Sequence, residues 1–139
     1  MSEAPLLSIQ DFSLEFNTFD GVYHAIEDVN IDLAKGESLG IVGETGCGKS
    51  VTAKSILKLV PSPPGRVRAG RILFNGEDLV QANEERMRAI RGLDIAMIFQ
   101  DPMTFLNPVF TVGDQLIDVI MAHQRFVAKK ESRTRREAK

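Results

Sequence analysis

The sequence predicts an α/β fold in which short apolar strands alternate with helices. Residues 43–50 read G-E-T-G-C-G-K-S, which fits the pattern G-x-x-x-x-G-K-[ST] at every fixed position. The apolar run at 38–42 has the length of a buried strand, and residues 51–60 continue with helical spacing. Strand, loop and helix in this order are the context that a phosphate-binding loop requires.

The loop residues offer the chemistry of a nucleoside triphosphate site. Glycines let successive backbone N–H groups turn inward toward an anion, and the following helix adds its positive end. Lys49 supplies an ammonium for the β- and γ-phosphates, and Ser50 offers a hydroxyl to Mg²⁺. The predicted nucleotide contacts in this stretch are Gly43, Glu44, Thr45, Gly46, Cys47, Gly48, Lys49, Ser50 and Val51.

The composition is that of an ordinary globular domain, with 139 residues of which 43% are hydrophobic. The 17 basic and 19 acidic residues leave a net charge of −2, so we expect no nucleic-acid partner. The first residues lack a secretory signal, and no run approaches the length of a membrane span. Cys47 is the single cysteine, which fits a reducing compartment. These features predict a cytoplasmic location.

Before the loop, alternating apolar residues at 7–16 and 29–33 predict two half-buried antiparallel strands. Residues 17–21 carry turn chemistry between them, with Asp-Gly as the strongest local signal. Aromatic residues near this turn, Phe16, Phe19 and Tyr23, could stack on a nucleotide base. Packing within the hairpin or the core is the alternative.

After the loop helix, prolines at 61–64 end the helical pattern. Residues 66–79 predict a strand centred on 70–74 and closed by an Asn75-Gly76 turn. Asn83 is predicted to cap a short helix that ends before Gly92. Met87 and Ile90 should face the core, whereas Arg86, Arg88 and Arg91 should form a solvated face.

A second apolar run at 94–99 predicts another buried strand, which stops at Gln100. A glutamine at the end of a parallel strand can reach a bound metal or its water. Spacing alone favours a surface-loop glutamine instead. Residues 111–114 predict a capping box that opens a helix. That helix carries an apolar stripe formed by Leu116, Ile117, Ile120 and Met121.

The loop, its lead-in at 35–42 and above all M-I-F-Q-D-P-M-T-F-L-N-P at 97–108 resemble the ATP-binding subunit of dipeptide/oligopeptide ABC importers. The resemblance covers essentially the whole chain, and the second stretch is specific for this branch. It implies an ATPase that powers peptide import with ATP and Mg²⁺. It further implies that Gln100 is the Q-loop glutamine, so that Lys49 and Gln100 are catalytic and Ser50 and Gln100 contact the metal. The family's base-stacking aromatic residue corresponds to Phe16 by strand register, with Tyr23 as the alternative.

The resemblance also implies partners: membrane-spanning permease subunits and a second ATP-binding subunit in a homo- or heterodimer. A substrate-binding protein would be an indirect partner. The location implied is peripheral, at the cytoplasmic face of the cell membrane. Position 105 is Phe where the family usually has Ser. An apolar cluster should dock a short permease helix, with burial against the helical subdomain as the alternative; its members are Met103, Phe105, Leu106, Val109 and Phe110.

The implied fold class is the P-loop NTPase core of an ABC nucleotide-binding domain with an N-terminal antiparallel β part, truncated before the signature motif. Residues 1–110 would hold the β part, the phosphate loop and the Q-loop, and residues 111–139 would begin the helical subdomain. The family's signature, Walker B carboxylates and switch histidine do not occur in these residues. We therefore expect this fragment alone to bind nucleotide weakly and to be inactive. A regulatory nucleotide-binding module without turnover, and a kinase or GTPase, are the alternative functions.

Overall fold

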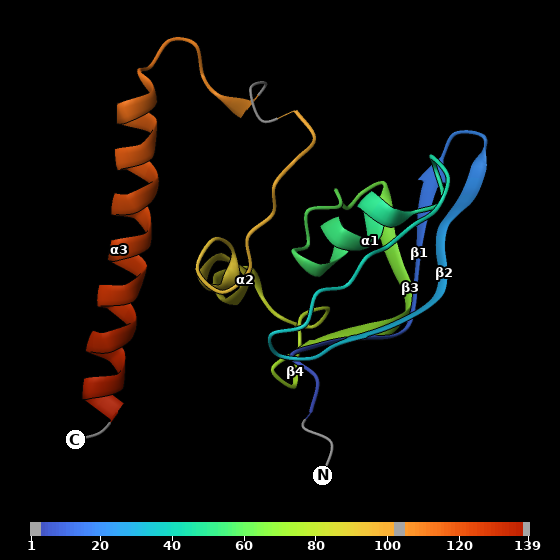
Figure 1. Cartoon of the computed structure of the whole chain (residues 1–139), viewed down its shortest axis with the longest axis horizontal. Coiled ribbons are helices and arrows are strands. Elements are labelled where there is room, and N and C mark those ends of the chain that lie inside the picture. Colours follow the sequence, from blue (N-terminus) through green and yellow to red (C-terminus); the bar gives the residue numbers. More distant parts are fainter. Residues whose placement is uncertain (1–3, 102–104, 138–139) are drawn as a thin grey trace. The chain divides into compact units, whose positions relative to one another are not determined.

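The computed structural model describes residues 4–101 and 105–137, and the chain divides into two compact units, Met1–Met87 and Arg88–Lys139 (Figure 1). The first unit contains the strands and the first helix. Helix α2 spans the boundary, and the last helix belongs to the second unit. The elements are β1 (Leu7–Thr18), β2 (Gly21–Leu33), α1 (Lys49–Ile56), β3 (Gly65–Phe74), β4 (Glu77–Asp78), α2 (Glu84–Ile90) and α3 (Val112–Glu137).

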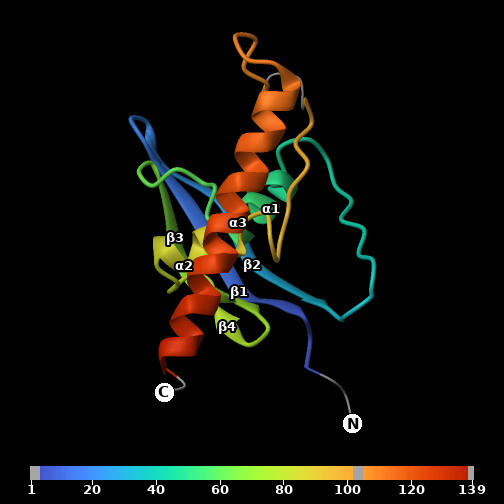
Figure 2. The same cartoon turned by 90° about the vertical axis from the view of Figure 1, so that its left-hand side faces the viewer.

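The four strands form one antiparallel sheet in the order β2-β1-β3-β4, and they run side by side in Figure 2. In the first hairpin Leu7 pairs with Leu33 and Thr18 pairs with Gly21. The hydroxyl of Thr18 donates a hydrogen bond to the Gly21 carbonyl at 2.8 Å. The predicted strands and the turn between them are confirmed.

The β3–β4 hairpin closes with a turn in which both central residues have positive φ. Asn75 has φ 50° and Gly76 has φ 80°. A two-residue turn with two positive φ values matches the right-handed twist of the strands, and Asn-Gly is the pair that adopts it most readily. The turn predicted from Asn75-Gly76 is therefore confirmed.

The core of the sheet is built from apolar residues on all three long strands. Ile9, Phe12 and Leu14 of β1 are buried together with Ile26 of β2 and Ile72 of β3. These positions follow the alternation of a strand, interrupted in β1 by irregularities in the pairing between Ile9 and Leu14. The half-buried character predicted for the first two strands follows from this arrangement.

Helix α1 is shorter than the helical spacing at 51–60 predicts, because Lys58 adopts a left-handed backbone conformation that ends the helix. Lys58 has φ 50°, its N–H donates to the Ser55 carbonyl at 3.0 Å, and the Leu59 N–H donates to the Lys54 carbonyl at 2.9 Å. These two bonds and the left-handed residue form a Schellman motif, which ends a helix. The Lys58 ammonium also donates to the Ala82 carbonyl at 2.6 Å, so it attaches the end of α1 to the segment before α2.

Two predicted strands are wrong. Residues 38–42 and 96–99 have irregular backbone, and Ile95 makes only an isolated bridge with Arg91. Val42 and Ile98 have exposed fractions of 97% and 91%. A buried strand needs a hydrogen-bonded neighbour, and within the described residues neither run has one. The apolar pattern therefore does not produce a strand here.

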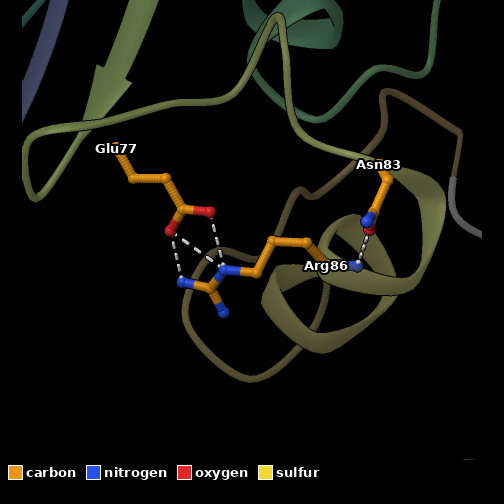
Figure 3. Close-up of polar contacts among 3 residues, drawn as sticks. All are labelled: Glu77, Asn83 and Arg86. Atoms are coloured by element: carbon orange, nitrogen blue, oxygen red, sulfur yellow. Dashed lines mark hydrogen bonds and ion pairs between the residues drawn. The ribbon is translucent and has the colours of Figure 1, made fainter.

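Helix α2 begins and packs as predicted. The side-chain oxygen of Asn83 accepts a hydrogen bond from the Arg86 N–H at 2.9 Å, and Met87 and Ile90 are fully buried. Arg86 departs from the predicted solvated face, because Glu77 on β4 lies beside it (Figure 3). The Arg86 guanidinium donates to both Glu77 oxygens at 2.7–2.9 Å. This bidentate pair joins α2 to the β3–β4 hairpin.

Helix α3 begins with the predicted capping box. The Asp114 N–H donates to the Thr111 hydroxyl at 3.1 Å, and that hydroxyl donates to the Asp114 carboxylate at 2.7 Å. The apolar stripe of this helix is exposed, with Leu116 and Ile117 each 59% accessible. Within the described part of the chain, none of the helices combines the length and the apolar character that crossing a membrane requires.

The Glu77–Arg86 pair makes the stability of the protein depend on pH. Hydrogen bonding to Arg86 lowers the pKa of Glu77 from its ordinary 4.5. Because the pKa is lowered, the pair contributes fully to stability at pH values above the ordinary pKa of 4.5. This contribution disappears as the pH falls through the folded-state pKa. We predict that Glu77→Gln lowers the free energy of unfolding at pH 7 by about 0.5–1 kcal/mol, since the pair is partly exposed.

Urea unfolding of both proteins between pH 7 and pH 3 measures this difference. The matched control is Asp118→Asn, which removes an exposed carboxylate on α3 and so controls for the loss of one negative charge. A difference between wild type and Glu77→Gln that stays constant down to pH 3 would contradict the assignment.

Candidate functional site

The phosphate-loop pattern at 43–50 lies against strand β2, and Gly48 is the point of closest approach. Gly48 is buried, has φ 92° and occupies the N-cap position of α1. A Cβ on this residue would lie 2.8 Å from the Ala25 carbonyl oxygen and 3.6 Å from Cγ1 of Ile26. Only glycine allows the loop to pass this close to the strand. The contact fixes where α1 begins.

Backbone N–H groups at the start of α1 are available to an anion. The first helical N–H to find an acceptor is that of Thr52, which donates to the Gly48 carbonyl at 2.8 Å. Among the described residues, the N–H groups of Lys49, Ser50 and Val51 donate to no protein acceptor, and no acidic side chain lies in the first turn. These donors and the positive end of the helix dipole favour a bound phosphate.

The Lys49 ammonium folds back over the loop. Nζ donates to the carbonyl oxygens of Gly43 and Glu44, both at 2.7 Å, and lies 3.3 Å from Sγ of Cys47. The four-carbon stem is flexible, so the ammonium can leave these carbonyls for a phosphate held by the loop. The sequence pattern could not show that the cation already has two acceptors within the loop, and the role of Lys49 toward a phosphate stays a prediction.

The remaining loop residues leave room for a ligand. Glu44, Thr45, Cys47 and Ser50 are exposed, and Val51 is half-buried. Within the described residues no group of three or more His, Cys, Asp or Glu side chains could hold a metal ion. The Ser50 hydroxyl is one hard oxygen ligand, so the site fits Mg²⁺ only together with phosphate oxygens and water, which is how Mg²⁺ commonly binds.

Phe16 and Tyr23 lie side by side on the face of the sheet that the loop covers. They are direct partners in the β1–β2 register, as are Leu14 and Ile26. Leu14 and Phe16 are two residues apart on β1, so all four side chains point to the same face. Ile26 is the residue beside Gly48. The structure therefore brings the aromatic pair to the loop side of the sheet.

The aromatic candidates differ in exposure. Phe16 is half-buried, and its Cε1 would lie 3.2 Å from a Cβ on Gly65. Tyr23 has an exposed fraction of 57%, and Phe19 is fully exposed at the tip of the hairpin. Phe16 thus has packing partners in the sheet, whereas Tyr23 presents most of its ring to solvent.

The comparisons with known proteins agree with this geometry. The family model described as ABC transporter matches residues 26–138. The chain belongs to the ABC transporter family. A solved structure, the dimeric form of a bacterial ABC transporter cassette, has a TM-score of 0.60 at 18% sequence identity and covers 76% of this chain and 42% of its own. This likeness confirms the predicted fold class.

Relatives of this ABC transporter chain include two proteins of Bacillus subtilis. It is 48% identical over 130 residues to the oligopeptide transport ATP-binding protein OppD and 50% identical over 128 residues to the dipeptide transport ATP-binding protein DppD. These matches cover 94% and 92% of the chain. The chain spans 36% and 38% of the length of the two relatives.

Gln100, the predicted Q-loop glutamine, belongs to the second unit of this ABC transporter chain. Gln100 is exposed and follows the irregular backbone at 96–99. The ring of Phe99 beside it packs on the ring of Phe105, with centroids 4.9 Å apart. Its role toward a nucleotide stays a prediction.

The predicted docking cluster is exposed where it is described. Met103 lies outside the described residues. The exposed fractions of the others are 66% for Phe105, 38% for Leu106, 82% for Val109 and 58% for Phe110. Burial of these side chains within the described chain, the alternative considered for them, is therefore not seen.

Sequence reasoning missed Gln115. Its side chain makes several hydrogen bonds to the backbone at 107–111. The only signal in the sequence is a polar residue directly before an apolar stripe, and that pattern does not distinguish a bonded glutamine from a solvated one.

Gly48 and Gly46 form a matched pair for testing the loop geometry. Both have φ 92°, but a Cβ on Gly46 would meet nothing within 4 Å. We predict that Gly46→Ala costs about 1–2 kcal/mol of unfolding free energy through its backbone conformation alone. Gly48→Ala should cost more, because the added Cβ also displaces the loop from β2. Urea unfolding of the two variants checks this order, and equal losses would show that the close approach to Ala25 does not constrain the loop.

Proposed function

We propose that this chain is the nucleotide-binding part of an ATPase that powers the import of dipeptides or oligopeptides. The observation that carries the proposal is the loop at 43–50, where free N–H groups and a movable ammonium converge. The relatives at 48% and 50% identity are named as oligopeptide and dipeptide transport ATP-binding proteins, which supports the choice of substrate class.

In this proposal the loop binds the phosphates of ATP. The N–H groups of Lys49, Ser50 and Val51 would donate to the phosphate oxygens, and Lys49 would exchange the carbonyls of Gly43 and Glu44 for the β- and γ-phosphates. Ser50 and Gln100 would hold Mg²⁺, which neutralises the charge that develops on the transferred phosphoryl group. Lys49 and Gln100 are the catalytic residues that we assign in this chain.

The adenine ring would stack at the aromatic pair on the loop side of the sheet. We favour Phe16, the position that the resemblance to the family implies, and its ring lies close to Gly65 of β3. Tyr23 is the alternative because it is adjacent and more exposed. An aromatic ring held rigidly by packing loses little entropy when a base stacks on it.

The proposed partners follow the family organisation. We propose permease subunits that contact the exposed apolar residues at 105–110, and a second ATP-binding subunit, in line with the dimeric cassette of the same fold. A substrate-binding protein would take part only indirectly. The chain would act at the cytoplasmic face of the membrane as a peripheral protein. Residues 1–110 would form the nucleotide-binding part, and residues 111–139 would begin the helical subdomain.

Lys49→Ala is predicted to weaken the binding of ATP by roughly 10- to 100-fold, since it removes charge-assisted hydrogen bonds to the phosphates. Adenosine, which lacks phosphates, should bind as to the wild type. Isothermal titration with both ligands measures the contrast. Lys54→Ala on the same helix is the matched control and should leave both affinities unchanged. Equal losses for ATP and adenosine would contradict the assignment.

The stacking residue is identified by comparing ATP with inorganic triphosphate. Phe16→Leu is predicted to weaken the binding of ATP by roughly tenfold, since one base–aromatic stack is lost. The affinity for triphosphate should not change. Tyr23→Leu should have a smaller effect, and Phe19→Leu at the hairpin tip is the control. If Tyr23→Leu gives the larger selective loss, Tyr23 is the stacking residue. If neither variant lowers the affinity for ATP more than the affinity for triphosphate, the base does not bind at this aromatic pair.

A further inference from the structure

The side chain of Gln115 fastens the backbone at 107–111 to the first turns of α3. Its Oε1 accepts a hydrogen bond from the Asn107 N–H at 2.9 Å. Its Nε2 lies 3.1 Å from the carbonyl oxygen of Asn107, 3.2 Å from that of Phe110 and 3.4 Å from that of Thr111. The amide carries two N–H donors, so it can satisfy two of these carbonyls at a time. With one accepted and two donated hydrogen bonds, this side chain therefore satisfies three backbone groups of the irregular segment.

The segment before it is stiffened by local bonds of its own. The side-chain oxygen of Asn107 accepts from the Val109 N–H at 3.0 Å, and the Phe110 N–H donates to the Asn107 carbonyl at 3.3 Å. With the capping box at Thr111 and Asp114, these bonds attach residues 107–111 to the start of α3. We call residues 105–111 the docking arm.

A second attachment to α3 lies two turns further on, at His123. The imidazole covers the bare Cα of Gly92, because a Cβ there would lie 2.6 Å from Nε2 and 2.8 Å from Cε1 of His123. Gly92 belongs to a tight turn in which its N–H donates to the Ile95 carbonyl at 2.9 Å and the Ile95 N–H donates to the Ile90 carbonyl at 3.1 Å. Residues 95–101, which we call the Gln100 arm, start from this turn.

The two arms also touch each other directly. The rings of Phe99 and Phe105 pack with centroids 4.9 Å apart and an interplanar angle of 37°. Phe99 is the neighbour of Gln100 in the Gln100 arm, and Phe105 opens the docking arm. The contacts of Gln115 with Asn107 and of Phe105 with Phe99 are therefore joined by the short backbone stretch from Phe105 to Asn107.

We propose that Gln115 and His123 are positioning residues for Gln100. They hold the docking arm and the Gln100 arm on one helix, and the Phe99–Phe105 contact makes the two arms respond together. This inference rests on the function proposed for Gln100.

The backbone order of the two arms tests the proposal in the full 139-residue chain. Amide ¹⁵N relaxation gives an order parameter for each residue, with about 0.85 for rigid backbone and less than about 0.6 for flexible backbone. The test variant is Gln115→Met, which keeps the length of the side chain and its helix propensity but removes all of its side-chain hydrogen bonds. Gln124→Met is the matched control, because it makes the same exchange at an exposed position of the same helix.

The decisive readout is Gln100, which Gln115 does not touch. Gln115→Met should lower the order parameters of Asn107 and Val109 and also that of Gln100 to below about 0.6, whereas Gln124→Met should lower none of them. His123→Ala should lower the order parameters of the Gln100 arm more than those of the docking arm. In a Phe105→Leu background the effect of Gln115→Met on Gln100 should be smaller, because the aromatic contact between the two arms has gone and only the covalent connection remains.

An effect of Gln115→Met that remains confined to residues 105–111 in the wild-type background would overturn the proposal and leave Gln115 as a local cap. An unchanged order parameter of Gln100 in His123→Ala would overturn the role proposed for His123. Amide signals of the β-sheet report whether each variant is folded, and the two anchors provide independent variants if one of them fails.

A functional readout separates this proposal from the one on which it rests. If Gln100 contacts Mg²⁺, Gln115→Met should reduce the gain in ATP affinity that Mg²⁺ provides and leave the Mg²⁺-free affinity unchanged. A wild-type chain whose ATP affinity does not respond to Mg²⁺ would contradict the role proposed for Gln100. The order parameters would still decide whether Gln115 and His123 hold the two arms.

Discussion

The contact of Gly48 with strand β2 is the constraint on which the site depends. Because a Cβ at this position would lie 2.8 Å from the Ala25 carbonyl, the loop can reach the strand only through glycine. That contact sets the start of α1, and with it the direction of the free N–H groups of Lys49 and Ser50. At its other end α1 is attached through the Lys58 ammonium to the Ala82 carbonyl. The anion-binding end of the helix is therefore fixed from both sides.

In the proposed function, the same sheet face would connect phosphate recognition with base recognition. The pairing of Leu14 with Ile26 and of Phe16 with Tyr23 places the aromatic pair on the side that carries the loop. In the second unit, Phe99, the neighbour of Gln100, packs on Phe105. Side chains that recognise a nucleotide in this proposal are thus held by backbone contacts made elsewhere, which is typical of sites assembled on a rigid scaffold.

Local chemistry was predictable from the sequence, and tertiary pairing was not. The Asn75-Gly76 turn, the Asn83 cap and the Thr111–Asp114 capping box all formed, because each depends on residues within a few positions of one another. Residues 38–42 and 94–99 have equally clear apolar patterns but form no strands, because strand formation depends on a distant partner. Gln115 was not predictable either, since its acceptors are backbone carbonyls of an irregular segment.

In the proposed function, the backbone of residues 43–51 forms an anion site before any side-chain or base contact is made. Titration of the ¹⁵N-labelled chain with inorganic triphosphate tests this most directly, with amide chemical shifts as the readout and chloride used to keep the ionic strength constant. We expect saturable shifts concentrated at Gly46, Gly48, Lys49 and Ser50, with no comparable shifts in the β3–β4 hairpin. Shifts that are spread over the basic surface and fail to saturate, or no shifts at the loop, would contradict it.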